Sequence, residues 1–102
     1  KFYNTGTPAY NATAYHAGVA PSAPTTPVND DTLNTFGWTD TGGKTFANAE
    51  YTVNGGTSYA NATANPQTGI TGAHAIGQVG VRYKAALGNP PSATLFNTAA
   101  FT

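Results

Sequence analysis

The sequence of 102 residues predicts a small, mainly β protein: an antiparallel β-sandwich or barrel preceded by an extended, proline-rich N-terminal arm. Three observations indicate this fold. Short runs rich in threonine, valine and aromatic residues alternate with turns rich in glycine and asparagine. No stretch shows the apolar period of an amphipathic helix. Four of the seven prolines fall within the first 32 residues, where they exclude a helix.

We expect the arm to span residues 1–32 and a single β-domain to span residues 33–102. GVAPSAPTTPVNDD (18–31) should run as polyproline or extended strand, because each proline removes a backbone donor and restricts the residue before it. The arm also carries more aromatic area than a simple linker. It is therefore expected to bind a partner, and the alternative is that it packs on its own domain. The expected partner-binding residues are Phe2, Tyr3, Pro8, Tyr10, Tyr15, Pro21, Pro24 and Pro27.

The first element after the arm is a strand. NTFGWTD (34–40) places Phe36 and Trp38 on one face at the two-residue period of a strand. TGG (41–43) then turns the chain.

A hairpin follows, in which KTFANAEYTV (44–53) pairs with TSYANAT (57–63). A three-residue loop, 54–56, would place Tyr51 directly opposite Tyr59 and put a glycine at the left-handed position that such loops require. A two-residue loop would pair Tyr51 with Ser58 instead, and we prefer the first register.

The remaining third contains a loop, a strand and a closing segment. ANPQTGITGAHAIG (64–77) is rich in turn residues and is expected to be a long loop. QVGVRYKAAL (78–87) alternates, so that Val79, Val81, Tyr83, Ala85 and Leu87 should face one way. GNPPS (88–92) ends that strand, and ATLFNTAAFT (93–102) closes the chain as a strand or a short helix.

Composition limits the classes of function. Charged residues make up 8% of the chain and the formal net charge is zero, so neither nucleic acid nor an anionic membrane is an expected partner. Without cysteine there is no disulfide, thiolate or cysteine-ligated zinc. No apolar run reaches the length of a membrane span. The sequence begins at Lys1 without methionine, which we interpret as a processed or trimmed chain.

Large apolar residues are scarce. Leu, Ile, Val and Phe together number 15, which predicts a thin core of marginal stability. Burial against copies or partners would add to that core, and a surface with few charges favours association. These features suggest a subunit of an assembly.

No residue pattern predicts catalysis, and we expect neither an enzyme nor a cofactor or metal. Asp30 and Asp31 lack the spaced oxygen ligands of a calcium loop and are expected to serve a turn or a cap. His16 and His74 are isolated. The nucleophile-elbow, P-loop and dinucleotide-binding patterns are missing from the sequence. An aromatic platform for sugar is a possible alternative, although Trp38 is expected in the core; its members would be Trp38, Tyr51, Tyr59 and Tyr83.

Three segments carry a resemblance to a known family. TPAYNATA (7–14), APSAPTTPV (20–28) and GWTDTGG (37–43) resemble the arm and the tryptophan-containing hairpin of lambda-type phage head decoration proteins. The resemblance implies a small β protein that trimerises on a viral capsid. It also implies that the arm adds a strand to the major capsid protein.

The sequence therefore predicts a structural assembly protein, with a phage capsid decoration or cement protein on the virion surface as the first hypothesis. Its partners would be copies of itself and a major capsid or neighbouring structural protein. The alternatives are an extracellular subunit of a secreted filament or surface layer of donor-strand type, and a small carbohydrate-binding module.

Overall fold

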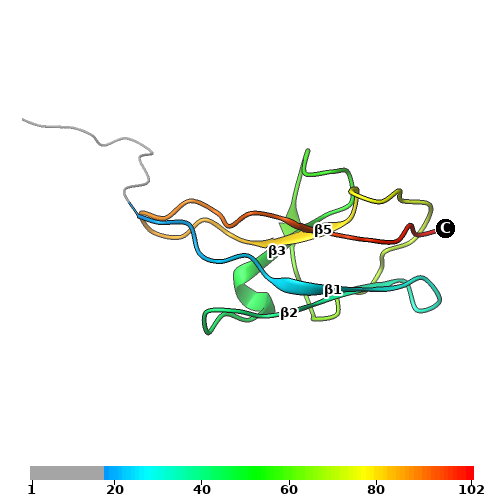
Figure 1. Cartoon of the computed structure of the whole chain (residues 1–102), viewed down its shortest axis with the longest axis horizontal. Helices are drawn as coiled ribbons and strands as arrows, with labels where there is room; N and C mark the ends of the chain where they lie inside the picture. Colours follow the sequence, from blue (N-terminus) through cyan, green and yellow to red (C-terminus); the bar gives the residue numbers. More distant parts are fainter. Residues whose placement is uncertain (1–17) are drawn as a thin grey trace, which may run out of the picture.

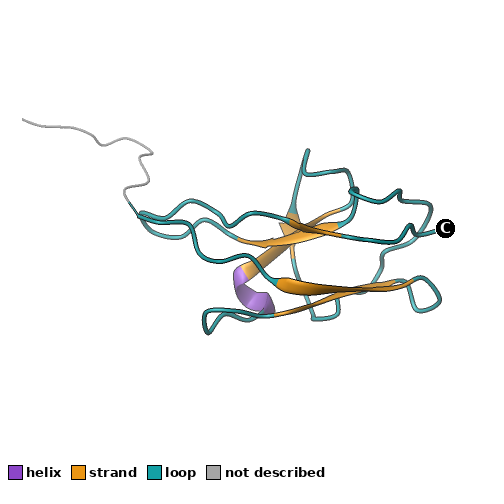
Figure 2. Cartoon of the chain, in the orientation of Figure 1, coloured by secondary structure: helices purple, strands orange, loops and turns teal. Residues whose placement is uncertain are grey.

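The structure, a computed structural model, describes residues 18–102. This part is mainly β and contains two antiparallel sheets, as the sequence predicts (Figures 1 and 2). Five of the predicted partner-binding residues lie outside the described residues: Phe2, Tyr3, Pro8, Tyr10 and Tyr15.

The first sheet is a hairpin of β1 (Thr25–Asp30) and β2 (Thr35–Thr39). Thr25 pairs with Thr39 and Val28 with Gly37, so two residues of β1 lie opposite Trp38 and form a bulge. Thr26, the first bulge residue, has a φ of 58°, a left-handed conformation that is strained for a β-branched side chain. The second is Pro27, which has no N–H to donate and fits a bulge in an edge strand.

The second sheet has the order β4-β3-β5-β6. Its central strands are β3 (Ala49–Thr52) and β5 (Gly80–Tyr83), paired so that Glu50 lies opposite Arg82. The short strands β4 (Ala60–Asn61) and β6 (Leu95–Phe96) flank them. All pairs are antiparallel, so each strand can send alternate side chains inward and outward.

The core lies between the two sheets. β2 contributes Phe36 and Trp38 to it, and β5 contributes Val81 and Tyr83, which confirms the expected faces of both segments. The complete buried cluster is Phe36, Trp38, Ala49, Ala62, Ile70, Val79, Val81, Tyr83 and Phe101. Two of these nine are alanines, so the core is as thin as the composition predicts.

The segment predicted as one strand over residues 44–53 is a 3-10 turn followed by a strand. η1 (Phe46–Asn48) precedes β3. Thr45 accepts from the Ala47 N–H at 3.3 Å, and the Asn48 side chain accepts from the Thr45 N–H at 3.0 Å. This reciprocal capping stabilises the turn and delays the start of the strand.

The predicted hairpin register, Tyr51 opposite Tyr59, is wrong: Tyr51 pairs with Ala60. Residues 53–59 form a longer loop, in which the Thr52 hydroxyl oxygen accepts from the N–H groups of Asn54 and Gly56 at 3.2 and 3.0 Å. A shift of one residue reverses the face of every side chain, so Tyr59 lies on the opposite side of the sheet from Tyr51.

The alternation predicted for residues 78–87 holds only to Tyr83. β5 ends there, and Ala85 and Leu87 are exposed instead of facing the core. The chain leaves the sheet as a hairpin whose base is fixed by Ser92, because the Ser92 hydroxyl accepts from the Tyr83 N–H at 2.9 Å. The closing segment contains the strand β6, and the long loop at 64–77 is confirmed.

The described end of the predicted arm belongs partly to the folded domain. Pro24 is fully buried, Pro21 and Pro27 are half-buried, and β1 pairs with β2. The Thr41 hydroxyl also donates to the Ala23 carbonyl at 3.1 Å. From Pro24 onward the chain packs on its own domain, so the predicted boundary at residue 33 falls within the β1–β2 turn.

Candidate functional site

Most large aliphatic side chains lie at the surface. The chain has ten Val, Leu and Ile residues, all of them within the described part. Three of these are buried, Leu95 is half-buried, and the other six are exposed: Val19, Val28, Leu33, Val53, Ile76 and Leu87. Single exposed aliphatics are ordinary, but a monomer that buries fewer than it exposes is unusual.

The two most exposed of these residues lie at one end of the molecule. The Gly18 N–H donates to the Gly88 carbonyl at 2.6 Å, which joins the start of the described chain to the end of a projecting hairpin. Leu87 is 100% exposed and Val19 is 85% exposed. We call residues 18–20 and 85–89 the tip; Figure 1 shows it at the end opposite the C-terminus.

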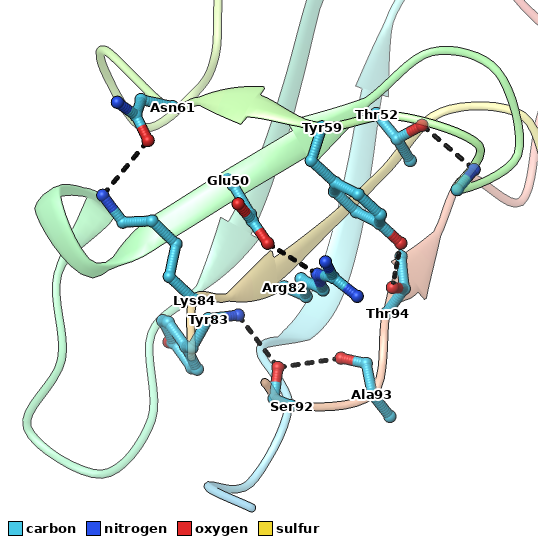
Figure 3. Close-up of polar contacts among 11 residues, drawn as sticks. Glu50, Thr52, Tyr59, Asn61, Arg82, Tyr83, Lys84, Ser92, Ala93 and Thr94 are labelled. Atoms are coloured by element: carbon cyan, nitrogen blue, oxygen red, sulfur yellow. Dashed lines mark hydrogen bonds and ion pairs between the residues drawn. The ribbon is translucent and has the colours of Figure 1, made fainter. Parts of the chain in front are cut away.

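The outer face of the second sheet carries a polar cluster (Figure 3). The Arg82 Nε donates to a Glu50 carboxylate oxygen at 2.7 Å, and its guanidinium carbon lies 3.7 Å from the centre of the Tyr59 ring. The Tyr59 hydroxyl hydrogen-bonds the Thr94 hydroxyl at 2.7 Å. These contacts fix the loop 53–59 over the sheet.

The four aromatic residues considered for a sugar platform do not share one exposed face. Trp38 and Tyr83 lie in the core, at 6% and 0% exposure, and Tyr51 packs against it. Tyr59 lies on the other side of the sheet, with one ring face covered by Arg82. A stacking site for sugar needs an accessible ring face, and this arrangement does not gather several of them.

The half-buried carboxylate of Asp40 holds two aromatic side chains in place at the edge of the core. One Asp40 oxygen accepts from the Trp38 indole N–H at 2.9 Å and from the Tyr83 hydroxyl at 2.8 Å. The Tyr83 hydroxyl oxygen in turn accepts from the Thr41 N–H at 2.9 Å. Burial raises the pKa of Tyr83, and the hydrogen bond to Asp40 adds to the rise, while the Thr41 N–H opposes it.

A tyrosine whose pKa is higher in the folded chain stabilises the fold in its neutral form. That stability is fully present below the unfolded-state pKa, about 10, and is lost as pH rises through the folded-state pKa. We expect Tyr83→Phe to cost about 1 kcal/mol at pH 7, because Asp40 and Thr41 each lose a partner. The difference in unfolding free energy between Tyr83→Phe and the wild type should become smaller above pH 10. Urea unfolding of both proteins from pH 7 to 11.5 measures it, and a constant difference would contradict the assignment.

Of the remaining ionisable groups considered for chemistry, His16 lies outside the described residues, and Asp30, Asp31 and His74 hold local structure. Asp30 accepts from the N–H groups of Thr32 and Leu33 at 3.1 and 2.9 Å, which confirms its turn role. Asp31 accepts from the hydroxyl and N–H of Thr102, and these bonds lower the pKa of Asp31. A His74 ring nitrogen lies 2.8 Å from the Thr71 carbonyl oxygen.

Among residues 18–102, no three His, Cys, Asp or Glu side chains gather as metal ligands. Nor is any helix of the same range long and apolar enough to cross a membrane.

The tip is the feature that sequence reasoning missed. Leu87 fits the strand alternation, which predicts that it faces the same way as Val79, Val81 and Tyr83. The available signal was the GNPP run directly after it, since a tight turn can place the residue before its glycine in solvent. Comparison of the chain with known proteins gave no matching family model, no matching curated relative and no matching solved structure.

Proposed function

We propose that this chain is a non-enzymatic structural subunit of a larger assembly, and that the assembly is a phage capsid which it decorates and stabilises. The observation that carries the proposal is the distribution of aliphatic side chains: six of ten are exposed and three are buried. Burying apolar surface against neighbours would recover the stabilisation that the monomer lacks.

The low charge supports the same proposal. Among the described residues the one ion pair, Arg82 with Glu50, joins neighbouring strands. Asp40 is occupied by Trp38 and Tyr83. Few charges therefore remain to keep copies apart, and association of neutral surfaces carries little electrostatic cost.

The proposed role of the arm is strand addition to a neighbouring structural protein. The described chain begins at the tip, away from the core, and the sequence before it contains Ala, Thr, Asn and Tyr with Lys1 as its single formal charge. Strand addition takes its affinity from backbone hydrogen bonds, which suits a segment of small and β-prone side chains.

Deletion of residues 1–17 tests the arm. We expect the shortened chain to unfold at the same urea concentration as the full chain, and its affinity for the shell to fall at least about tenfold. A deletion through residue 28 is a poorer test, because it removes buried Pro24 and most of β1. Lys1→Ala, which keeps the arm, serves as the control. Undiminished binding of the deleted chain would refute the arm's role.

The identity of the assembly is tested by immunogold electron microscopy of native particles, with an antibody against residues 18–102. Regular labelling of icosahedral shells supports the proposal. Labelling along helical filaments or a cell envelope would overturn the capsid assignment in favour of a filament or surface-layer subunit. If the antibody labels no particle and the protein is a monomer that binds glycans, every assembly hypothesis would be overturned.

A further inference from the structure

Asn54 occupies a position at which an asparagine can modify its own side chain. Of the ten asparagines of the chain, Asn54 alone is followed by glycine. In deamidation, the backbone nitrogen of the following residue attacks the side-chain amide, and glycine obstructs that attack least because it has no side chain. Asn54 and Gly55 are both exposed, so water reaches them. By residue type, this pair is the most reactive deamidation site of the chain.

The reaction consumes only water. The Gly55 N–H loses its proton to solvent and its nitrogen bonds to the Asn54 Cγ, while the side-chain nitrogen takes up a proton and leaves as ammonia. Water then opens the resulting five-membered imide at one of its two carbonyl groups, which gives aspartate or isoaspartate. Either product replaces a neutral amide by a carboxylate, so the formal net charge, which is zero, becomes negative.

The folded loop 53–59 holds both reacting groups in hydrogen bonds. The Asn54 side-chain oxygen accepts from the Thr52 hydroxyl at 2.8 Å and from the Ser58 N–H at 3.1 Å. Its nitrogen donates to the Ser58 hydroxyl oxygen at 2.9 Å. The Gly55 N–H donates to the Gln78 carbonyl at 2.9 Å. The attacking N–H cannot pass its proton to solvent while that bond is made, and the amide cannot turn while it is held on both sides.

We propose that Asn54 is a deamidation site which the folded loop protects, and which reacts when the loop opens locally. Five of the six residues 53–58 are exposed, so the bonds that hold the loop compete with water. Such a loop opens at a lower free-energy cost than the packed sheets beneath it. The protection is a property of the loop and does not depend on any assembly.

The two products should affect the loop differently. Aspartate leaves the backbone unchanged, and its carboxylate can accept from the Thr52 hydroxyl and from both the N–H and the hydroxyl of Ser58. Isoaspartate lengthens the backbone by one carbon between the Thr52 and Gln78 contacts. The lengthened loop cannot keep both contacts in their present geometry, so isoaspartate should also loosen the Tyr59 ring from Arg82.

Peptide mapping by mass spectrometry of the full-length protein, incubated at mildly alkaline pH, measures the protection. Deamidation of Asn54 should be at least about tenfold slower in the folded protein than in the same chain held unfolded in urea. In urea, Asn54 should react before every other asparagine. Equal rates in the two states, or an Asn54 that stays intact in urea, would overturn the proposal.

Ser58→Ala tests whether the loop's own hydrogen bonds provide the protection. It removes the acceptor of the Asn54 side-chain nitrogen and should raise the folded-state rate at least about threefold, with no change of rate in urea. Thr57→Ala, an exposed substitution in the same loop, is the matched control and should change the rate less than about twofold. Equal folded-state rates for the two variants refute the role of Ser58. A rate increase matched by an equal loss of global stability refutes local opening.

The products are compared after ion-exchange separation, which their added negative charge permits. Asn54→Asp reproduces the aspartate product and should keep the wild-type hydrogen exchange of the Gly55 and Gly56 amides. In the isoaspartate form these two amides should exchange at least about tenfold faster. Wild-type exchange in the isoaspartate form would show that the loop does not depend on its present backbone length, and would overturn the proposed release.

Discussion

Replacing Asn97 by alanine is expected to lower the free energy of unfolding by about 3 kcal/mol. The Asn97 side chain is 2% exposed and makes four hydrogen bonds to backbone groups. Its oxygen accepts from the Gly77 and Val79 N–H groups at 2.9 and 3.1 Å. Its nitrogen donates to the Ala75 and Ala99 carbonyls at 3.2 and 2.8 Å. Alanine would leave all four backbone groups without that partner, at a cost of about 0.5–1.5 kcal/mol each.

Urea unfolding monitored by circular dichroism measures this loss. Asn61→Ala is the matched control, because Asn61 is exposed and its side chain accepts a single 3.2 Å hydrogen bond from Lys84. It should cost less than about 0.5 kcal/mol. Similar losses of unfolding free energy for the two variants would contradict a stabilising role for the four Asn97 hydrogen bonds.

Gly80→Ala should destabilise the fold by about 2 kcal/mol. Gly80 lies in β5 opposite Phe96, and a Cβ there would meet the Thr94 methyl at 2.7 Å and the Phe96 ring at 2.8 Å. The Leu95 carbonyl oxygen, at 3.0 Å, belongs to the backbone and cannot rotate away. Relief of the clash therefore requires β6 to shift away from β5.

Gly37→Ala provides the control for that effect. Gly37 is also a buried strand glycine, but the nearest atom to its added Cβ is the Pro66 Cβ at 3.3 Å. The stability of the Gly37→Ala variant should stay within about 1 kcal/mol of the wild type. The reduced entropy of its unfolded chain stabilises the fold, and slight crowding in the folded state offsets this gain. Hydrogen exchange of the β6 amides should increase in Gly80→Ala and remain unchanged in Gly37→Ala.

The local sequence pattern predicted burial correctly within the strands, where alternate side chains face the core. The two-residue period correctly placed Phe36 and Trp38 in β2, and Val79, Val81 and Tyr83 in and beside β5. The same period gave the wrong result at Leu87, because a period cannot tell where a strand ends. That end depends on Ser92, which is nine residues from Tyr83 in sequence.

The hairpin register failed for a different reason. Pairing Tyr51 with Tyr59 maximises a local cross-strand contact, but Tyr59 instead stacks on Arg82 and hydrogen-bonds Thr94. Both partners lie far along the sequence, and tertiary contacts of this kind override local preference. By contrast, the 3-10 turn was readable: Thr45 and Asn48 have the spacing of a reciprocal cap.

The projecting tip could not be predicted from the sequence, because it depends on the contact between Gly18 and Gly88. Nothing in either segment alone indicates that they meet across seventy residues. The burial of Pro24, one of the predicted partner-binding residues, likewise arises from the packed domain and has no local signal. Its neighbour Pro27 was correctly placed in extended backbone, because a proline restricts geometry locally.

The direction of β1 determines how the domain would carry a mechanical load. β1 runs away from the tip, with its last residues near the C-terminal segment, where the Asn29 side chain donates to the Ala99 carbonyl at 3.0 Å (Figure 1). Tension on the chain before Gly18 would pull β1 along its own axis. Hydrogen bonds of an antiparallel pair lie perpendicular to that axis, so the bonds to β2 would be sheared together instead of being unzipped one at a time.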